Sequence, residues 1–133
     1  MVHLIAFDTS KFDVSEETPN PINPIVGESF LVWLRGELAG TPYDMTAPEA
    51  EDWGWYACVT GAGASYMVGA SADTQGLGAE VKWTIQLHKA RSLKEKLLGQ
   101  NKLKGDDPLL AVIEKIIRSD RDIGSIEVTR EVK

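Results

Sequence analysis

Cysteine, histidine and long apolar runs are scarce in this sequence, and each shortage excludes a class of protein. Cys58 is the single cysteine of the 133 residues, so the chain can form neither an internal disulfide nor a zinc site built from several thiolates. No stretch approaches the roughly 18 consecutive apolar residues of a membrane-spanning helix. Residues 1–13 also lack the basic start and long apolar core of a secretory signal. We therefore expect a cytoplasmic protein without a membrane partner.

Basic residues are also scarce in the first part of the chain. Residues 1–81 contain twelve acidic side chains and two basic ones, whereas residues 82–104 contain seven basic side chains and one acidic one. The net charge of −6 argues against broad binding of nucleic acids, which requires a surplus of positive charge. This segregation of charge by sign is the least ordinary feature of the sequence.

The apolar periodicity predicts a single α+β domain covering residues 1–133, with enough hydrophobic residues for one sizeable core. Predicted strands lie at 2–8, on both sides of a glycine-rich turn within 53–72, at 80–89 and at 126–132, and predicted helices at 23–40 and 106–120. The order β-α-β-β-β-α-β indicates a two-layer sandwich, with helices on one face of a mainly antiparallel sheet. A ferredoxin-like core with an extra strand is the nearest known arrangement, and no motif identifies a family.

Capping residues predict where the main helices begin and end. Asn23 is the expected N-cap of the first helix, with Pro24 at its first position and Gly40 at its end. Asp107 and Pro108 are expected to have the same roles at the start of the last helix.

The connections between these elements are less regular. The stretches 41–53 and 71–78 are polar and are predicted to be surface loops. One or two helical turns are predicted within 90–105, ending at Gly99. Three leucines of that segment are expected to face inward: Leu93, Leu97 and Leu98.

The run Gly61-Ala62-Gly63-Ala64-Ser65 could be a phosphate-binding loop or the turn of a β-hairpin. A phosphate-binding loop needs a helix directly after it, because the N-terminus of that helix holds the anion. Here the residues on both sides alternate with period two, and Tyr66 stands where a third glycine would be needed. We therefore predict a hairpin. The alternation also places Trp53 and Trp55 on one apolar strand face, so we interpret the tryptophans as core residues.

No arrangement of side chains identifies a catalytic or metal site, and no cofactor is predicted. His3 and His88 lack a nearby ligand in the sequence, although neighbouring strands could bring them together. Cys58 lies on a predicted strand and would need a base such as His88 to become a nucleophile. One functional alternative is therefore a small-molecule site or a modest enzyme, with a pocket near four side chains: Trp55, Tyr56, Cys58 and His88.

Two charged segments are the candidate partner-binding surfaces. The first is acidic and ends at an aromatic residue: Asp44, Glu49, Glu51, Asp52 and Trp53. The second is basic: Lys89, Arg91, Lys94, Lys96, Lys102 and Lys104. Each segment could also be an ordinary solvated surface. We favour a non-catalytic module of an inhibitory or immunity type, which binds another protein or itself through opposite charges.

Overall fold

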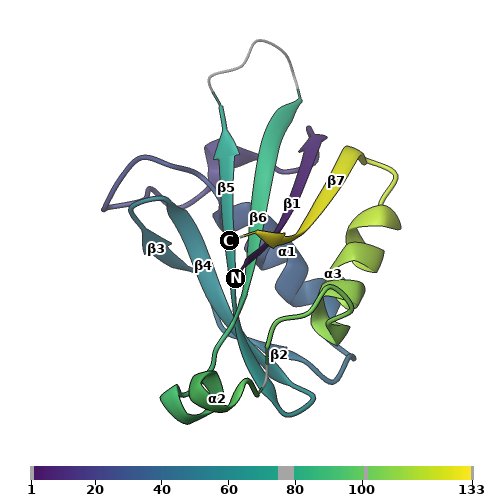
Figure 1. Ribbon diagram of the computed structural model, residues 1–133. Coiled ribbons are helices and arrows are strands. Elements are labelled where there is room, and N and C mark those ends of the chain that lie inside the picture. Colours follow the sequence, from purple (N-terminus) through teal and green to yellow (C-terminus); the bar gives the residue numbers. More distant parts are fainter. Residues whose placement is uncertain (1, 75–79, 101, 133) are drawn as a thin grey trace.

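The computed structural model describes residues 2–74, 80–100 and 102–132, and its central feature is an antiparallel sheet (Figure 1). The seven strands are β1 (Val2–Thr9), β2 (Asp44–Met45), β3 (Glu49–Glu51), β4 (Gly54–Gly61), β5 (Ala64–Asp73), β6 (Val81–Lys89) and β7 (Ile123–Val132). They follow the order β2-β4-β5-β6-β1-β7, and β3 also pairs with β4. All six strand pairings between described residues are antiparallel. This order does not confirm the ferredoxin-like arrangement.

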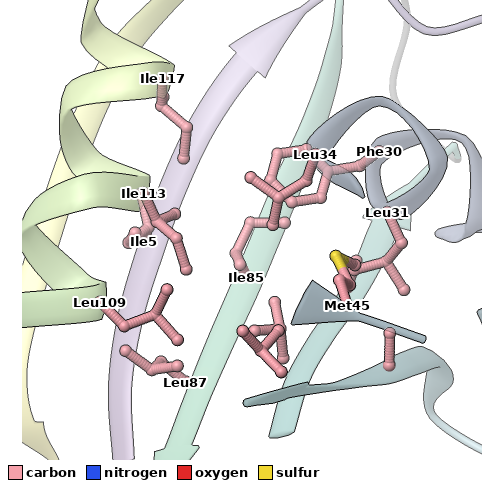
Figure 2. Packing of buried hydrophobic residues seen from close by; sticks show 14 of the residues in the cluster. Ile5, Phe30, Leu31, Leu34, Met45, Ile85, Leu87, Leu109, Ile113 and Ile117 are labelled. Atoms are coloured by element: carbon pink, nitrogen blue, oxygen red, sulfur yellow. The ribbon is translucent and has the colours of Figure 1, made fainter. Parts of the chain in front are cut away.

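Three α-helices accompany the sheet within the described residues. They are α1 (Glu28–Leu38), α2 (Leu93–Leu98) and α3 (Pro108–Arg118), and a short 3₁₀ helix, η1 (Val14–Glu16), follows β1. The buried side chains of α1 and α3 pack on alternate residues of the strands. In Figure 2, Ile113 of α3 lies beside Ile5 of β1, and Leu34 of α1 lies over Ile85 of β6. The period-two alternation of the strands therefore supplies one wall of the core.

The glycine-rich run forms the predicted hairpin turn between β4 and β5. Gly61 pairs with Ala64, so the turn consists of Ala62 and Gly63, which both have positive φ (51° and 75°). Two residues with positive φ are the signature of the tight turn that suits the twist of a hairpin. The chain continues as a strand, and not as a helix, so this run lacks the helix N-terminus of a phosphate-binding loop.

The start of α1 differs from the prediction. The helix begins at Glu28, and its N-cap is Gly27 instead of Asn23. The preceding residues are drawn towards the sheet, because the carbonyl of Val26 accepts a hydrogen bond from the amide of Ala72 at 3.1 Å. The amides at the start of the helix, which have no acceptor within the helix, donate to a side chain from an earlier part of the chain. The carboxylate of Glu17 accepts from the amides of Gly27 and Glu28, each at 2.9 Å, and from that of Ser29 at 3.0 Å.

The start of α3 agrees with the prediction, whereas the two predicted loops are partly strands. Helix α3 begins as predicted, with Pro108 in its first turn and the Asp107 carboxylate accepting from the amide of Leu109 at 3.0 Å. The stretch 41–53 is not entirely a loop, because β2 and β3 lie within it and pair with β4. In the predicted loop 71–78, β5 continues to Asp73, and residues 75–79 lie outside the described part of the chain.

Candidate interaction surface

Helix α2 is a short helix fixed at both ends by its own sequence. The hydroxyl of Ser92 accepts from the amide of Glu95 at 3.1 Å, and the Glu95 carboxylate accepts from the amide of Ser92 at 2.9 Å. This reciprocal capping satisfies two amides that a helix start would otherwise leave unpaired. Gly99 ends the helix in the left-handed conformation at φ 67°, as predicted.

The leucines of α2 face solvent, contrary to the prediction. Leu93, Leu97 and Leu98 are 74 %, 77 % and 60 % exposed, and no residue of the helix is buried. The physical reason is that Leu103, which is buried, anchors this segment to the core in their place. Figure 1 shows α2 at one end of the sheet, at a distance from α1 and α3. Helix α2 therefore presents a cluster of apolar side chains that nothing in the described chain covers.

Most of the predicted basic residues gather beside α2. A hollow of about 390 Å³ lies where β6 ends, lined by His88, Lys89, Arg91, Lys96, Lys102, Leu103 and Lys104. Five of the six basic residues of the sequence prediction are therefore brought together, and Lys94 is not among the lining residues. We call this cavity the basic hollow.

A buried acidic group lies next to the basic hollow. The ammonium group of Lys89 lies 3.2 Å from Oδ2 of Asp107, whose side chain is almost completely buried. The hydroxyl of Tyr66 donates to both carboxylate oxygens of Asp107, at 2.9 and 3.1 Å. Burial, followed by the hydrogen bond to Asp107, raises the pKa of Tyr66 above its ordinary value near 10. Three elements, β5, β6 and the start of α3, are thus joined by one carboxylate.

Replacing Tyr66 with phenylalanine tests this junction. We expect the free energy of unfolding to fall by about 1.5–3 kcal/mol at pH 8, because a buried hydrogen bond to a charged group is lost. Unfolded tyrosine ionises near pH 10, whereas folded Tyr66 keeps its proton to higher pH. This contribution is therefore fully present below pH 10 and is lost as the pH rises towards the raised pKa. Urea denaturation at pH 8 and pH 11 should show a smaller difference between wild type and variant at pH 11, and an unchanged difference would contradict the assignment.

The acidic residues lie along the edge of the sheet that β2 and β3 form. Asp44 belongs to β2, Glu49 and Glu51 belong to β3, and Asp52 lies in the turn between β3 and β4. The charge and hydrogen-bonding of Glu49 raise the pKa of Tyr56, which it faces across the β3–β4 pair. Charged side chains on short edge strands also discourage pairing with other chains, so this acidic edge has a structural role whether or not it binds a partner.

Trp53 does not share a strand face with Trp55. Glu51 pairs with Gly54, so Trp53 lies in the two-residue turn before β4, and Gly54 has a φ of 147° that interrupts the alternation. The ring of Trp53 covers Gly69: a methyl group on Gly69 would lie 2.5 Å from it. Trp55, in contrast, is buried in the core. The prediction of a common face was therefore wrong, because the strand begins one residue later than the alternation suggested.

The four residues of the alternative pocket lie on both faces of the sheet. Trp55 alternates with Tyr56 and Cys58 along β4, and only Trp55 points into the core. Cys58 and His88 both face Met67, because β5 lies between β4 and β6. Their strands therefore do not pair, and the direct contact that would let His88 activate the thiol is not formed. His88 instead lines the basic hollow, and burial lowers its pKa.

The two histidines do not form a metal site together. Strands β1 and β6 do pair, with His3 opposite Leu87, but His3 is buried in the core whereas His88 points to the other face of the sheet. The imidazole of His3 donates to the carbonyl of Lys104 at 2.7 Å, and that of His88 donates to Oε1 of Gln86 at 3.1 Å. Among the described residues, no group of three or more histidine, cysteine or acidic side chains could hold a metal ion.

The chain is thus a small mixed α/β protein with an open, seven-stranded antiparallel sheet and three helices in its described part. Comparison of the chain with protein-family models, with curated proteins and with solved structures gave no match. None of the helices within residues 2–74, 80–100 and 102–132 has the length and apolar character needed to cross a membrane. The function must therefore be argued from the surface itself.

Proposed function

We propose that this protein acts by non-catalytic binding of an acidic protein partner through the surface of α2. This α2 surface consists of three leucines and the neighbouring cations: Leu93, Leu97, Leu98, Arg91, Lys94 and Lys96. The main observation in support of this proposal is that all three leucines are exposed on one short helix. Contiguous exposed apolar side chains with a charged rim are typical of interaction sites. The surrounding positive charge favours a negatively charged partner and would accelerate its association.

The acidic edge supports an inhibitory or immunity-type role as the second part of this proposal. Asp44 and Glu49 are exposed on strands at the border of the sheet, where a basic protein could dock. The protein then has two surfaces of opposite sign, which also permits head-to-tail association of two copies. The unpaired, exposed thiol of Cys58 is compatible with a reducing cytoplasm, where we place the protein.

Affinity capture with matched variants tests the α2 surface. Leu93→Ser/Leu97→Ser removes apolar area from α2, whereas Val32→Ser removes a residue that is 56 % exposed on α1. We expect a protein that binds the wild type in stoichiometric amount, is released by high salt and binds the leucine variant at least about tenfold more weakly, because central apolar contacts dominate interface affinity. Equal binding of that protein to both variants would contradict the proposal.

Charge reversal provides a second readout for the same surface. Lys94→Glu/Lys96→Glu inverts two exposed charges on α2 without removing a buried contact. We expect a slower association rate and a weaker salt dependence, since charges at an interface rim act mainly on the approach of the partner. Stopped-flow association at two salt concentrations measures both quantities. An unchanged rate with the captured partner would exclude electrostatic steering by these lysines.

A further inference from the structure

The basic hollow is lined by an unusual set of side chains. Of the seven lining residues that the structure describes, six are lysine, arginine or histidine, and none of the seven is acidic. Its volume of about 390 Å³ lies in the range of small-molecule sites, roughly 300–1,000 Å³. It therefore differs from an exposed row of lysines, because the cations converge on one concave space.

The walls of the hollow are anchored to the core. Leu103 is buried, and it holds the exposed residues Lys102 and Lys104 on either side of it in place. The backbone of Lys104 is also held by the hydrogen bond from His3, which is completely buried. The side chain of Lys102 lies over the end of α2, where a methyl group on Gly99 would be 3.5 Å from its Cε and 3.7 Å from its Nζ.

The arginine of the hollow is oriented in a similar way. Nε of Arg91 donates to the carbonyl of Gln100 at 3.0 Å, and Nη2 donates to that of Glu95 at 3.2 Å. Both acceptors are backbone carbonyls, one within α2 and one just after it, so they fix the guanidinium without neutralising its charge. A planar, pre-oriented guanidinium with further N–H groups is well suited to bind phosphate oxygens.

Positive charge in the hollow exceeds what the described chain compensates. Lys89 is paired with Asp107. Among the side chains that the structure describes, those of residues 2–74, 80–100 and 102–130, no carboxylate lies within ion-pair distance of Arg91, Lys96, Lys102 or Lys104. Like charges that line one cavity repel each other, and a bound anion with several charges relieves this repulsion.

From this convergence we infer that the basic hollow is a binding site for a phosphate-bearing ligand that carries at least two negative charges. Lysines supply point charges and Arg91 supplies directed N–H groups, a combination that recognises phosphate and diphosphate groups. The ligand could be a free phosphorylated metabolite or a phosphorylated side chain of a protein, and both offer the same chemistry to the hollow. This inference goes beyond the proposed function, because it concerns the hollow and not the leucines of α2.

Calorimetric titration of the isolated protein with inorganic pyrophosphate tests the site. We expect one saturable site per chain, with affinity at least about tenfold weaker in Lys102→Gln/Lys104→Gln, because two charge-assisted contacts are lost. Lys115→Gln/Arg121→Gln is the matched control: it also removes two exposed cations, and both lie outside the hollow. The control should bind as the wild type does. Absence of saturation, heat no larger than that of sodium chloride at equal ionic strength, or equal weakening in both double variants would overturn the inference.

Two further measurements are useful. One distinguishes a small phosphorylated molecule from a phosphorylated protein side chain as the ligand, and the other separates this inference from the proposed function of the α2 surface. Tighter binding of ADP than of pyrophosphate would assign the site to a small phosphorylated molecule, and tighter binding of a phosphoserine peptide would assign it to a protein-borne phosphate; both results support the phosphate chemistry. Leu93→Ser/Leu97→Ser should retain pyrophosphate binding, because these side chains do not line the hollow. If pyrophosphate does not bind, the proposed role of the α2 surface is unaffected. If the α2 surface binds no partner, the inference about the hollow is likewise unaffected.

Discussion

Replacing Asp107 with alanine is expected to lower the free energy of unfolding by about 3–5 kcal/mol, the cost of removing one partner of a buried ion pair. The substitution leaves the ammonium of Lys89 and the hydroxyl of Tyr66 without their acceptor. It also removes the cap of α3, because the amide of Leu109 donates to the same carboxylate. Since three elements meet at this carboxylate, no single rearrangement restores all of these contacts.

Asp106 offers a control at the adjacent position. It is exposed and forms no ion pair among the described residues, so Asp106→Ala should change stability by less than about 0.5 kcal/mol. Urea denaturation at neutral pH, followed by circular dichroism, measures both variants. If the two substitutions have equal effects, the buried carboxylate does not hold these elements together.

Replacing Gly27 with alanine is expected to destabilise the protein by about 3 kcal/mol, at the upper end of the range for overpacking. A methyl group at this position would lie 2.2 Å from the carbonyl oxygen of Ala70 and 2.8 Å from its carbon. These are backbone atoms of a strand paired on both sides, so they cannot move aside easily. The bridge between Val26 and Ala72 also prevents the chain before α1 from lifting off the sheet.

Gly36 provides the matched comparison within the same helix. It is exposed, and a methyl group there would meet no atom within 4 Å outside its own helical turn. Gly36→Ala should therefore stabilise the protein by about 0.5–1 kcal/mol, because alanine loses less backbone entropy in a helix. Thermal denaturation of both variants shows directly whether each substitution raises or lowers the stability of the protein. A loss below about 1 kcal/mol for Gly27→Ala would show that the helix start can shift away from β5.

The features that were predicted correctly from the sequence are determined by residues that lie close together in the chain. The start of α3 needed only Asp107 and Pro108, which act within one turn of the chain. The hairpin needed only alternation on both sides of Ala62 and Gly63. Strand β6 was evident from the buried alternation that includes Trp83. In each case the determining residues are neighbours in the sequence.

Distant contacts decided the features that the sequence did not predict. Asn23 has the chemistry of an N-cap, but Glu17 performs the capping from ten and more residues away. The side chain of Asn23 instead donates to the carbonyl of Asp52 at 2.8 Å. The spacing of leucines within a short helix does not show which face turns towards the core. Here Leu103, which follows the helix, occupies the core, and Leu97 faces solvent.

The basic hollow was predictable in composition but not in shape. The run of basic residues was evident in the sequence, and charge alone identified it as a candidate surface. Its wall includes Lys104, whose carbonyl accepts a hydrogen bond from His3, a residue 101 positions away in the sequence. The signal that could have found the hollow is Leu103, a single apolar residue between two lysines, because such a residue commonly anchors a charged segment.

The position of β1 has a consequence for how the chain reaches this structure. Leu4 pairs with Gln86 of β6 on one side and with Thr129 of β7 on the other (Figure 1). Strand β1 is therefore synthesised well before β7, and its pairing is complete only after β7 has been made. Such non-local pairing slows folding, since long loops must close before the contacts that stabilise them can form. Until then β1 has unpaired backbone groups at least along the edge that β7 covers, so the nascent chain is more vulnerable to aggregation than the folded protein.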